Sequence, residues 1–319
     1  MRLKFVGIRL LRGLLTLWFA VTVAFFLVRL LPGDPVLAVA DPNMTEELRA
    51  KLLADFGLDR PLFVQYAEYM VQLLQGNMGI SFRQALPVTE VLLERLPWTL
   101  ILTMSALAVT VIVGIPLGVL AATRAHRLTD RIVQVTGITA QSLFVPSIGV
   151  FLLYTLGVVI PIFPIGGAIN LDATGFDATL SMLHHLVLPG LSLVLIQLGN
   201  FVLSMRSTLL EALGEDYVAL AKAKGVRPRA VVWKHAVRNA LLPTTTLAGL
   251  QLGALFGGAI LTETIYAYPG IGRAIYEAVG QQDYPVLQGA FILLAAAVVV
   301  ANLITDLAYG FLDPRVRTS

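Results

Sequence analysis

Residues 98–123 read WTLILTMSALAVTVIVGIPLGVLAAT, and no side chain in this stretch is charged. A helix of about 20 apolar residues is long enough to cross the hydrocarbon core of a bilayer, roughly 30 Å. Inside lipid the backbone must satisfy its own hydrogen bonds, so the segment is expected to be helical. Five further apolar runs have this character: 10–31 (uncharged core 13–28), 132–159, 186–205, 240–262 and 286–309. The sequence therefore predicts an all-α polytopic membrane protein with six transmembrane helices.

The composition of the 319 residues supports the same class. Hydrophobic residues make up 57% and charged residues only 13%, about half the charged share of a soluble domain. The formal charge of +3 suggests no nucleic-acid partner, because the basic residues gather in the connections between the apolar runs. With no cysteine in the chain, disulfides and cysteine-ligated metals are excluded.

The basic residues also orient the predicted spans. Sixteen of them lie in the N-terminus, the 124–131 and 206–239 connections and the C-terminal tail, against six in the other connections, with Arg29 near a boundary. By the positive-inside rule, both termini are expected in the cytoplasm of a multi-pass protein of the cell (inner) membrane. A cleavable signal peptide ending at Ala38-Val39-Ala40 is the alternative for the first run.

Four regions follow from this topology: 1–31, the N-terminus and first span; 32–97, an external helical insertion; 98–310, a five-span core; and 311–319, a cytoplasmic tail. In the insertion, one helix is expected from Asn43 or Thr45 to Phe56. A second is expected after Pro61, with Phe63, Tyr66, Met70 and Leu74 on one side. The insertion is predicted to be either a lid on the bundle or a docking surface for an external partner.

The connection 206–239 is charged and helical in pattern. Residues 217–224 are good helix formers, Gly225 ends the helix, and a second helix is expected from Pro228 to Asn239. Small alanines would let the groove of a partner close around the first helix. We therefore expect movement of the partner to be transmitted to the bundle through this helix. The alternative is a basic helix that rests on anionic lipid headgroups.

Several motifs in order make the chain resemble, over essentially its whole length, the inner-membrane permease subunits of the dipeptide, oligopeptide and nickel class of ABC importers. They are LPGDP at 31–35, GLDRPL at 57–62 with QY at 65–66, GNMGIS at 76–81, EDY at 215–217 through AKAKG at 221–225, RNALLP at 238–243, YPGIGR at 268–273, DYP at 283–285 and LDPR at 312–315.

The resemblance implies that the loop 206–239 couples the chain to separate ATPase subunits. The implied coupling residues are Glu215, Asp216, Tyr217, Ala219, Leu220, Ala221, Lys222, Ala223, Lys224 and Gly225. Aligned on Gly225, Ala221 matches the second alanine of the general Glu-Ala-Ala signature. Ala219 and Leu220 depart from its glutamate and first alanine.

The implied partners are two cytoplasmic ATPase subunits, a second homologous permease, an external solute-binding protein and membrane lipid. The chain has no phosphate-binding loop, so no cofactor is expected on it, and ATP and Mg would belong to the ATPase subunits. No catalytic residue and no metal site is predicted. The function that follows is import of peptides, or of nickel, glutathione-like peptides or sugars in the same class. An ion-driven secondary transporter or a channel is the alternative from another class.

Polar residues inside the predicted spans are candidates for the translocation pathway or for hydrogen bonds between helices. They are Gln141, Gln197, Asn200, Gln251 and Asn302. Glycines at four-residue intervals predict close helix packing, within the chain or against another one. These are Gly114, Gly118, Gly249, Gly253 and Gly257. Glu263 and Asp306 lie near span ends, where a hydrated boundary is expected. Pro116, Pro146 and Pro189 are expected to kink their helices.

Overall fold

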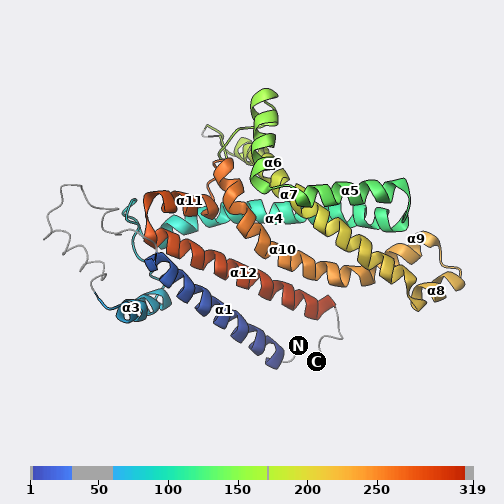
Figure 1. Cartoon of the computed structure of the whole chain (residues 1–319), viewed down its shortest axis with the longest axis horizontal. Helices are drawn as coiled ribbons and strands as arrows, with labels where there is room; N and C mark the ends of the chain where they lie inside the picture. The colour runs from blue at the N-terminus through green and yellow to red at the C-terminus, as the bar shows by residue number, and fades with distance from the viewer. Residues whose placement is uncertain (1–2, 31–59, 171, 313–319) are drawn as a thin grey trace.

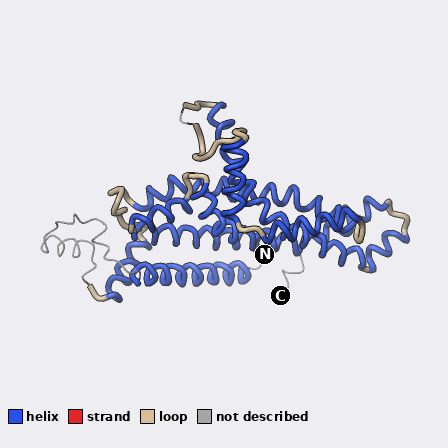
Figure 2. Tube along the Cα trace, turned by 45° about the horizontal axis from the view of Figure 1, so that its top comes forward, coloured by secondary structure: helices blue, strands red, loops and turns tan. Residues whose placement is uncertain are grey.

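The computed structural model describes residues 3–30, 60–170 and 172–312, and within them the chain is almost entirely helical (Figure 2). The α-helices are α1 Leu3–Leu30, α3 Leu62–Leu74, α4 Val88–Thr123, α5 Leu128–Ser142, α6 Val145–Leu152, α7 Phe176–Gly214, α8 Asp216–Ala223, α9 Pro228–Ala230, α10 Val237–Ile265, α11 Ile271–Gln281 and α12 Tyr284–Leu312. Two π-helical segments, η1 Leu153–Val159 and η2 Val231–Ala236, continue α6 and α9. The predicted all-α membrane architecture is confirmed.

Among the residues that the structure describes, five helices are long and apolar enough to cross a membrane. The candidate spans are Gly7–Leu27, Val88–Thr123, Phe176–Gly214, Leu247–Ile265 and Tyr284–Thr305. They correspond to the first, second, fourth, fifth and sixth predicted spans. A sixth crossing is present only if the bent pair Leu128–Ser142 and Val145–Val159 counts as one span.

The third predicted span, 132–159, is not one straight helix. The chain bends by 100° between α5 and α6, where Leu143 and Phe144 are extended. Pro146 explains the position, because a proline lacks the amide hydrogen and its ring clashes with the carbonyl four residues earlier, here that of Ser142. The helix is therefore interrupted at this point rather than kinked as expected. After the break, α6 projects away from the bundle (Figure 1).

Other prolines leave their helices unbroken. Pro116 lies inside α4, Pro189 inside α7 and Pro243 inside α10. Neighbouring helices and the absence of competing water allow proline within membrane helices. The helix expected to end at Asn239 therefore runs on through η2 into α10, and α7 reaches Gly214, well into the predicted coupling loop.

The long helices pack side by side in the order α1, α12, α10, α7; α4 contacts α7, α10 and α12, and α5 contacts α7 and α4. α4 and α7 form the most extensive helix pair. Figure 1 shows that α8 and α9 lie at one end of the bundle, and α3 and α11 at the opposite end. We call these the α8 end and the α11 end.

α3 begins directly after Pro61, as predicted, but its four expected neighbours do not share one environment. Tyr66 and Met70 are partly buried, whereas Phe63 and Leu74 are strongly exposed. By their spacing the four residues lie on one side of the helix, as predicted, but only part of that side is covered, since Tyr66 packs against Phe25 of α1. The expected helix before Gly57 and the Ala38-Val39-Ala40 sequence lie outside the described residues.

Candidate functional site

The short helix α8 has a well-defined end. Gly225 has φ +74°, a left-handed conformation that glycine adopts without strain. Its N–H donates to the Lys222 carbonyl at 3.0 Å, and the Val226 N–H donates to the Ala221 carbonyl at 3.2 Å. This pair of bonds is the Schellman motif that closes a helix C-terminus. The predicted role of Gly225 as a helix stop is therefore visible in the backbone.

α8 presents two different faces. Val218 and Ala221 are buried in an apolar cluster with Met205 and Leu209 of α7. On the other side, Asp216, Ala219, Leu220 and Ala223 are exposed, and Leu220 is 56% exposed. We call these last four residues the coupling face. Lys222 and Lys224 are also exposed, Glu215 precedes the helix, and Tyr217 is partly buried.

Ala221 therefore differs in setting from the other implied coupling residues. Its side chain packs inward on the α7 cluster. A small residue at this position lets α8 lie close to the bundle, so its contribution to a partner surface would be indirect.

A buried ion pair joins α5 to α7. Asp130 of α5 is 2% exposed and accepts from Arg206 of α7 through both carboxylate oxygens, with Nη2 to Oδ2 at 2.8 Å. Asp130 also accepts from the His126 N–H at 2.9 Å and from Gln134 at 2.9 Å. Through Asp130, the turn between α4 and α5 is therefore bonded to Arg206, in the C-terminal part of α7.

The five polar pathway candidates differ in burial. Gln197 and Gln251 are buried, and the Oε1 atom of each has no hydrogen-bond partner within the described ranges. Asn200 and Asn302 are exposed, and Gln141 is partly buried against Gly199. Two buried acceptors without partners are costly unless water or another chain reaches them.

The candidate glycines differ in what they contact. A Cβ atom on Gly114 would lie 2.9 Å from Phe201, and one on Gly118 would lie 2.6 Å from Met205, both on α7. On Gly249 it would lie 2.1 Å from Thr305 of α12, and on Gly253 it would lie 3.4 Å from Val298. Gly257 has nothing within 4 Å in the described chain. Four of these glycines thus face neighbouring helices of the same chain, and Gly257 faces open space.

The α11 end contains a buried carboxylate that the sequence suggested was hydrated. Glu263 is fully buried, so the expected hydrated boundary is wrong for this residue. Its carboxylate accepts from the Thr99 hydroxyl at 2.7 Å and from the Arg273 N–H at 3.1 Å. Thr99 in turn accepts from the Ile271 N–H at 2.8 Å. Glu263 therefore binds the first turn of α11, whose free N–H groups favour a negative charge.

Two glycines of the YPGIGR motif make this contact possible. A Cβ atom on Gly270 would collide with the Glu263 carboxylate, and one on Gly272 would lie 2.4 Å from the Ile260 backbone. Tyr268, the first residue of the motif, is fully buried. Burial raises the pKa of the Tyr268 hydroxyl, and the nearby Glu263 carboxylate raises it further. The motif thus packs α11 tightly onto the end of α10.

A second buried carboxylate follows α11. Asp283 is 3% exposed and accepts from the Ser81 hydroxyl and from the Phe82 N–H at 3.2 Å. It also lies 3.5 Å from the Val286 N–H, at the start of α12, the position of a helix N-cap. Both ends of α11 are therefore fixed by carboxylates that accept mainly from uncharged groups.

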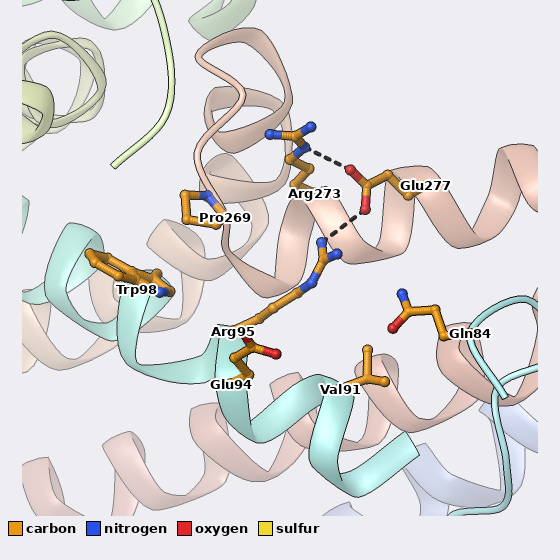
Figure 3. A pocket seen from close by; sticks show the side chains of 8 residues that line it. All are labelled: Gln84, Val91, Glu94, Arg95, Trp98, Pro269, Arg273 and Glu277. Carbon is orange, nitrogen blue, oxygen red and sulfur yellow. Dashed lines mark hydrogen bonds and ion pairs between the residues drawn. The ribbon is translucent and has the colours of Figure 1, made fainter. Parts of the chain in front are cut away.

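A polar pocket opens between α4 and α11 (Figure 3). Its volume is about 280 Å³, and it is lined by Gln84, Val91, Glu94, Arg95, Trp98, Pro269, Arg273 and Glu277. Glu277 bridges two guanidinium groups, at 2.9 Å from Arg95 Nη1 and 2.7 Å from Arg273 Nε. These side chains are 22–36% exposed, so water screens their charges.

Histidine, aspartate and glutamate side chains do not gather in groups of three as metal ligands anywhere in the described ranges. His184 contacts the Ile162 carbonyl at 2.9 Å, and His185 contacts the Ser181 carbonyl at 2.8 Å. Both of these histidines lie in the N-terminal part of α7, where they make local contacts.

Taken together, the geometry is a membrane bundle with a short amphipathic helix exposed at one end and, at the other, the helix α11, which buried carboxylates hold at both ends. Residues 114–318 match the family described as "Binding-protein-dependent transport system inner membrane component", and residues 2–103 match its N-terminal counterpart. The chain belongs to this family, the multi-pass inner-membrane component of ABC transporters. In this family the membrane component is not catalytic, and the ATPase is a separate subunit.

Particular relatives are similar over nearly the whole chain. The dipeptide transport system permease protein DppB of Escherichia coli (strain K12) is 38% identical over 313 residues, covering 92% of each chain. The di/tripeptide permease DppB of Pseudomonas aeruginosa (strain UCBPP-PA14) is 38% identical and covers 99% of each chain. The oligopeptide permease AppB of Bacillus subtilis (strain 168) is 35% identical, covering 92% of this chain and 93% of the relative.

A solved structure shares the fold. A chain of the MetNI methionine ABC transporter, in an inward-facing conformation, superimposes with a TM-score of 0.56 at 19% identity. The match covers 70% of this chain and 96% of that chain.

Sequence reasoning missed the buried carboxylates. The glycines at 270 and 272 close to a glutamate were the available signal for the Glu263 contact, because glycine in a structured motif often permits close backbone approach. For the Asp130–Arg206 pair, the sequence contained no local signal, since the partners lie on different helices.

Proposed function

We propose that this chain is the permease subunit of an ATP-driven importer of peptides, which an external solute-binding protein delivers. It forms half of the translocation pathway together with a second homologous permease. Two cytoplasmic ATPase subunits bind ATP and Mg and drive it through the loop 206–239. The permease relatives named for dipeptide, di/tripeptide and oligopeptide transport support the choice of peptides.

The observation that carries the coupling role is the construction of α8. A helix of eight residues is closed by a glycine, packed through Val218 and Ala221, and free on the coupling face. Small side chains at Ala219 and Ala223 let a groove on a partner approach the helix backbone, while Leu220 offers an apolar contact. α7 and η2 lie against the same cluster, so a displacement of α8 would pass directly into α7 and α10.

This proposal also sets the topology. The α8 end and both termini lie in the cytoplasm, and the α11 end faces outward together with the insertion 32–97. The basic residues near α8, including Lys222, Lys224, Arg227, Arg229 and Lys234, are exposed, as the positive-inside rule requires for that side.

The first experiment uses the absence of cysteine from the chain. One cysteine replaces Ala219 or Ala223 in the assembled complex, and a second set carries it at Gln281, an exposed residue of the α11 end. We expect crosslinks to an ATPase subunit from α8 only, with yields that change on nucleotide binding. A membrane-inserted complex that captures no ATPase from α8, or captures it equally from Gln281, would contradict the coupling role.

Topology and substrate are tested in the same variants. In intact cells, a membrane-impermeant maleimide should label the cysteine at 281 but not that at 219. Peptide uptake should require both the ATPase subunits and the binding protein. Uptake driven by an ion gradient without ATPase would favour a secondary transporter, and uptake of nickel or sugars without peptides would change the substrate class.

Among the polar pathway candidates, we infer the strongest role for Gln197 and Gln251. Each places a buried amide oxygen without a partner among the described residues, which a hydrated pathway would satisfy. Gln197→Leu and Gln251→Leu should lower peptide uptake while leaving the ATPase crosslink from Ala219→Cys intact. Unchanged uptake by both variants would remove these residues from the pathway.

A further inference from the structure

The helix α3 has three distinct faces. Tyr66, Tyr69, Met70 and Leu73 form a packed face and are partly buried. Phe63, Ala67, Val71 and Leu74 form a free apolar face, and Phe63 and Leu74 are 82% and 84% exposed. Glu68, Gln72 and Gln75 form a polar face. At about 3.6 residues per turn these sets occupy successive parts of the helix circumference, with the free apolar face between the other two.

The packed face fixes the depth of α3 relative to the membrane. The Tyr66 hydroxyl lies 2.8 Å from the Thr22 hydroxyl of α1. The Tyr66 ring lies 5.3 Å from that of Phe25 and 5.8 Å from that of Phe26, between ring centroids. These partners belong to the candidate span Gly7–Leu27. Thr22 lies about 7 Å before the end of that span along the helix axis.

Arg29 marks the boundary itself. Its Nε donates to the Gln65 amide oxygen at 2.9 Å, and its guanidinium carbon lies 3.8 Å from the Phe25 ring centroid. An arginine just past an apolar span is typical of the interface between hydrocarbon and water. α3 therefore lies beside the last two turns of the span rather than beyond its end.

At this depth a side chain that points away from the protein meets lipid. We propose that α3 is an interfacial helix whose free apolar face inserts into the acyl chains of the leaflet at the α11 end, while its polar face remains in water. A helix with adjacent apolar and polar faces lies in the interface plane in this way. The partner is a phospholipid surface.

Spin labelling of the assembled complex in phospholipid nanodiscs tests this directly. Single cysteines at Val71, Leu74 and Phe63 report on the free apolar face, and cysteines at Glu68 and Gln72 are the matched controls on the same helix. We expect labels at 71, 74 and 63 to be accessible to oxygen and poorly accessible to a water-soluble nickel chelate. At 68 and 72 the order should be reversed.

A second measurement sets the depth independently. A bimane fluorophore at Val71 or Leu74 should be quenched severalfold more by lipids with a nitroxide near the headgroup end of the acyl chain than a bimane at Gln72. Nickel-chelate access at 71 and 74 would place this face in water. Low access of both reagents there, without lipid quenching, would show that protein covers it. Either result would overturn the proposal.

Discussion

The two ends of the bundle are held together by different physical means. At the α8 end, one face of α8 packs into an apolar cluster with α4, α7, η2 and α10, and a buried ion pair, Asp130–Arg206, joins α5 to α7. At the α11 end, the carboxylates of Glu263 and Asp283 accept mainly from hydroxyl and backbone N–H groups. Apolar packing lacks directional constraint, whereas each hydrogen bond fixes a distance and an angle. We expect α8 to tolerate small displacements and α11 to hold one position.

The largest effect on stability is expected at the buried ion pair between Asp130 and Arg206. Asp130→Ala leaves Arg206, whose side chain is 17% exposed, without its partner. Loss of one member of a buried pair costs about 3–5 kcal/mol, so the free energy of unfolding should fall by that amount. Unfolding followed by tryptophan fluorescence in detergent is the measurement.

Glu211→Ala is the matched control, because Glu211 is an exposed carboxylate on the same helix as Arg206. It should change the stability by about 0.5 kcal/mol or less. Equal effects of the two substitutions would mean that Asp130 and Arg206 form no buried pair.

Glycine 272 tests the rigidity of the α11 end. In Gly272→Ala the new methyl group would lie 2.4 Å from the Ile260 backbone, which cannot move without shifting α10. Overpacking of this kind costs about 1–3 kcal/mol. Thermal unfolding should show the loss, together with greater accessibility of a cysteine placed at Ser81.

The same substitution at Gly280 of α11 is the control, since nothing lies within 4 Å of its Cβ position in the described structure. Alanine is the better helix former by up to about 1 kcal/mol, so Gly280→Ala should be neutral or slightly stabilising. A similar loss in both variants would indicate that α11 is not tightly packed.

Much of the fold was predictable, because long apolar runs in lipid have few structural options. The second, fourth and sixth predicted spans lie within α4, α7 and α12, and Gly225 stops α8 as its position suggested. The break at Pro146 was underestimated, since the strength of a proline kink depends on whether neighbouring helices support the bend.

The site was harder to predict than the spans. Glu263 looks like an ordinary boundary glutamate in the sequence, and only the approach of α11 through Gly270 and Gly272 buries it. Ala221 matches a signature position, yet its burial depends on Met205 and Leu209 in α7. These properties arise from tertiary contacts between residues far apart in the chain, and hydropathy and spacing carry little information about them.

α10 runs between the two ends of the bundle. Substitutions at two of its glycines test which positions pack within this chain and which are open. Gly249→Ala would place a methyl group 2.1 Å from Thr305, a side chain that can partly adjust. We expect a loss of about 1–2 kcal/mol in the free energy of unfolding of the isolated chain.

Gly257→Ala should leave the isolated chain unchanged, because its Cβ position is open in the described structure. If Gly257 packs against the second permease, Gly257→Leu will weaken assembly of the pair without affecting the isolated subunit. Normal assembly of that variant would exclude Gly257 from the permease interface.

The smallest effect is expected at the partly exposed ion pair between Arg95 and Glu277, at the α11 end. Arg95 and Glu277 are 22% and 31% exposed, against 2% for Asp130. A double-mutant cycle with Arg95→Ala and Glu277→Ala should give a coupling energy of about 0.2–1 kcal/mol that decreases with added salt. The equivalent cycle at Asp130 and Arg206 should give a larger and less salt-dependent value, because protein replaces water around that pair. Equal coupling at both pairs would mean that burial does not distinguish them, and the contrast between the two ends would then rest on the hydrogen bonds of Glu263 and Asp283 alone.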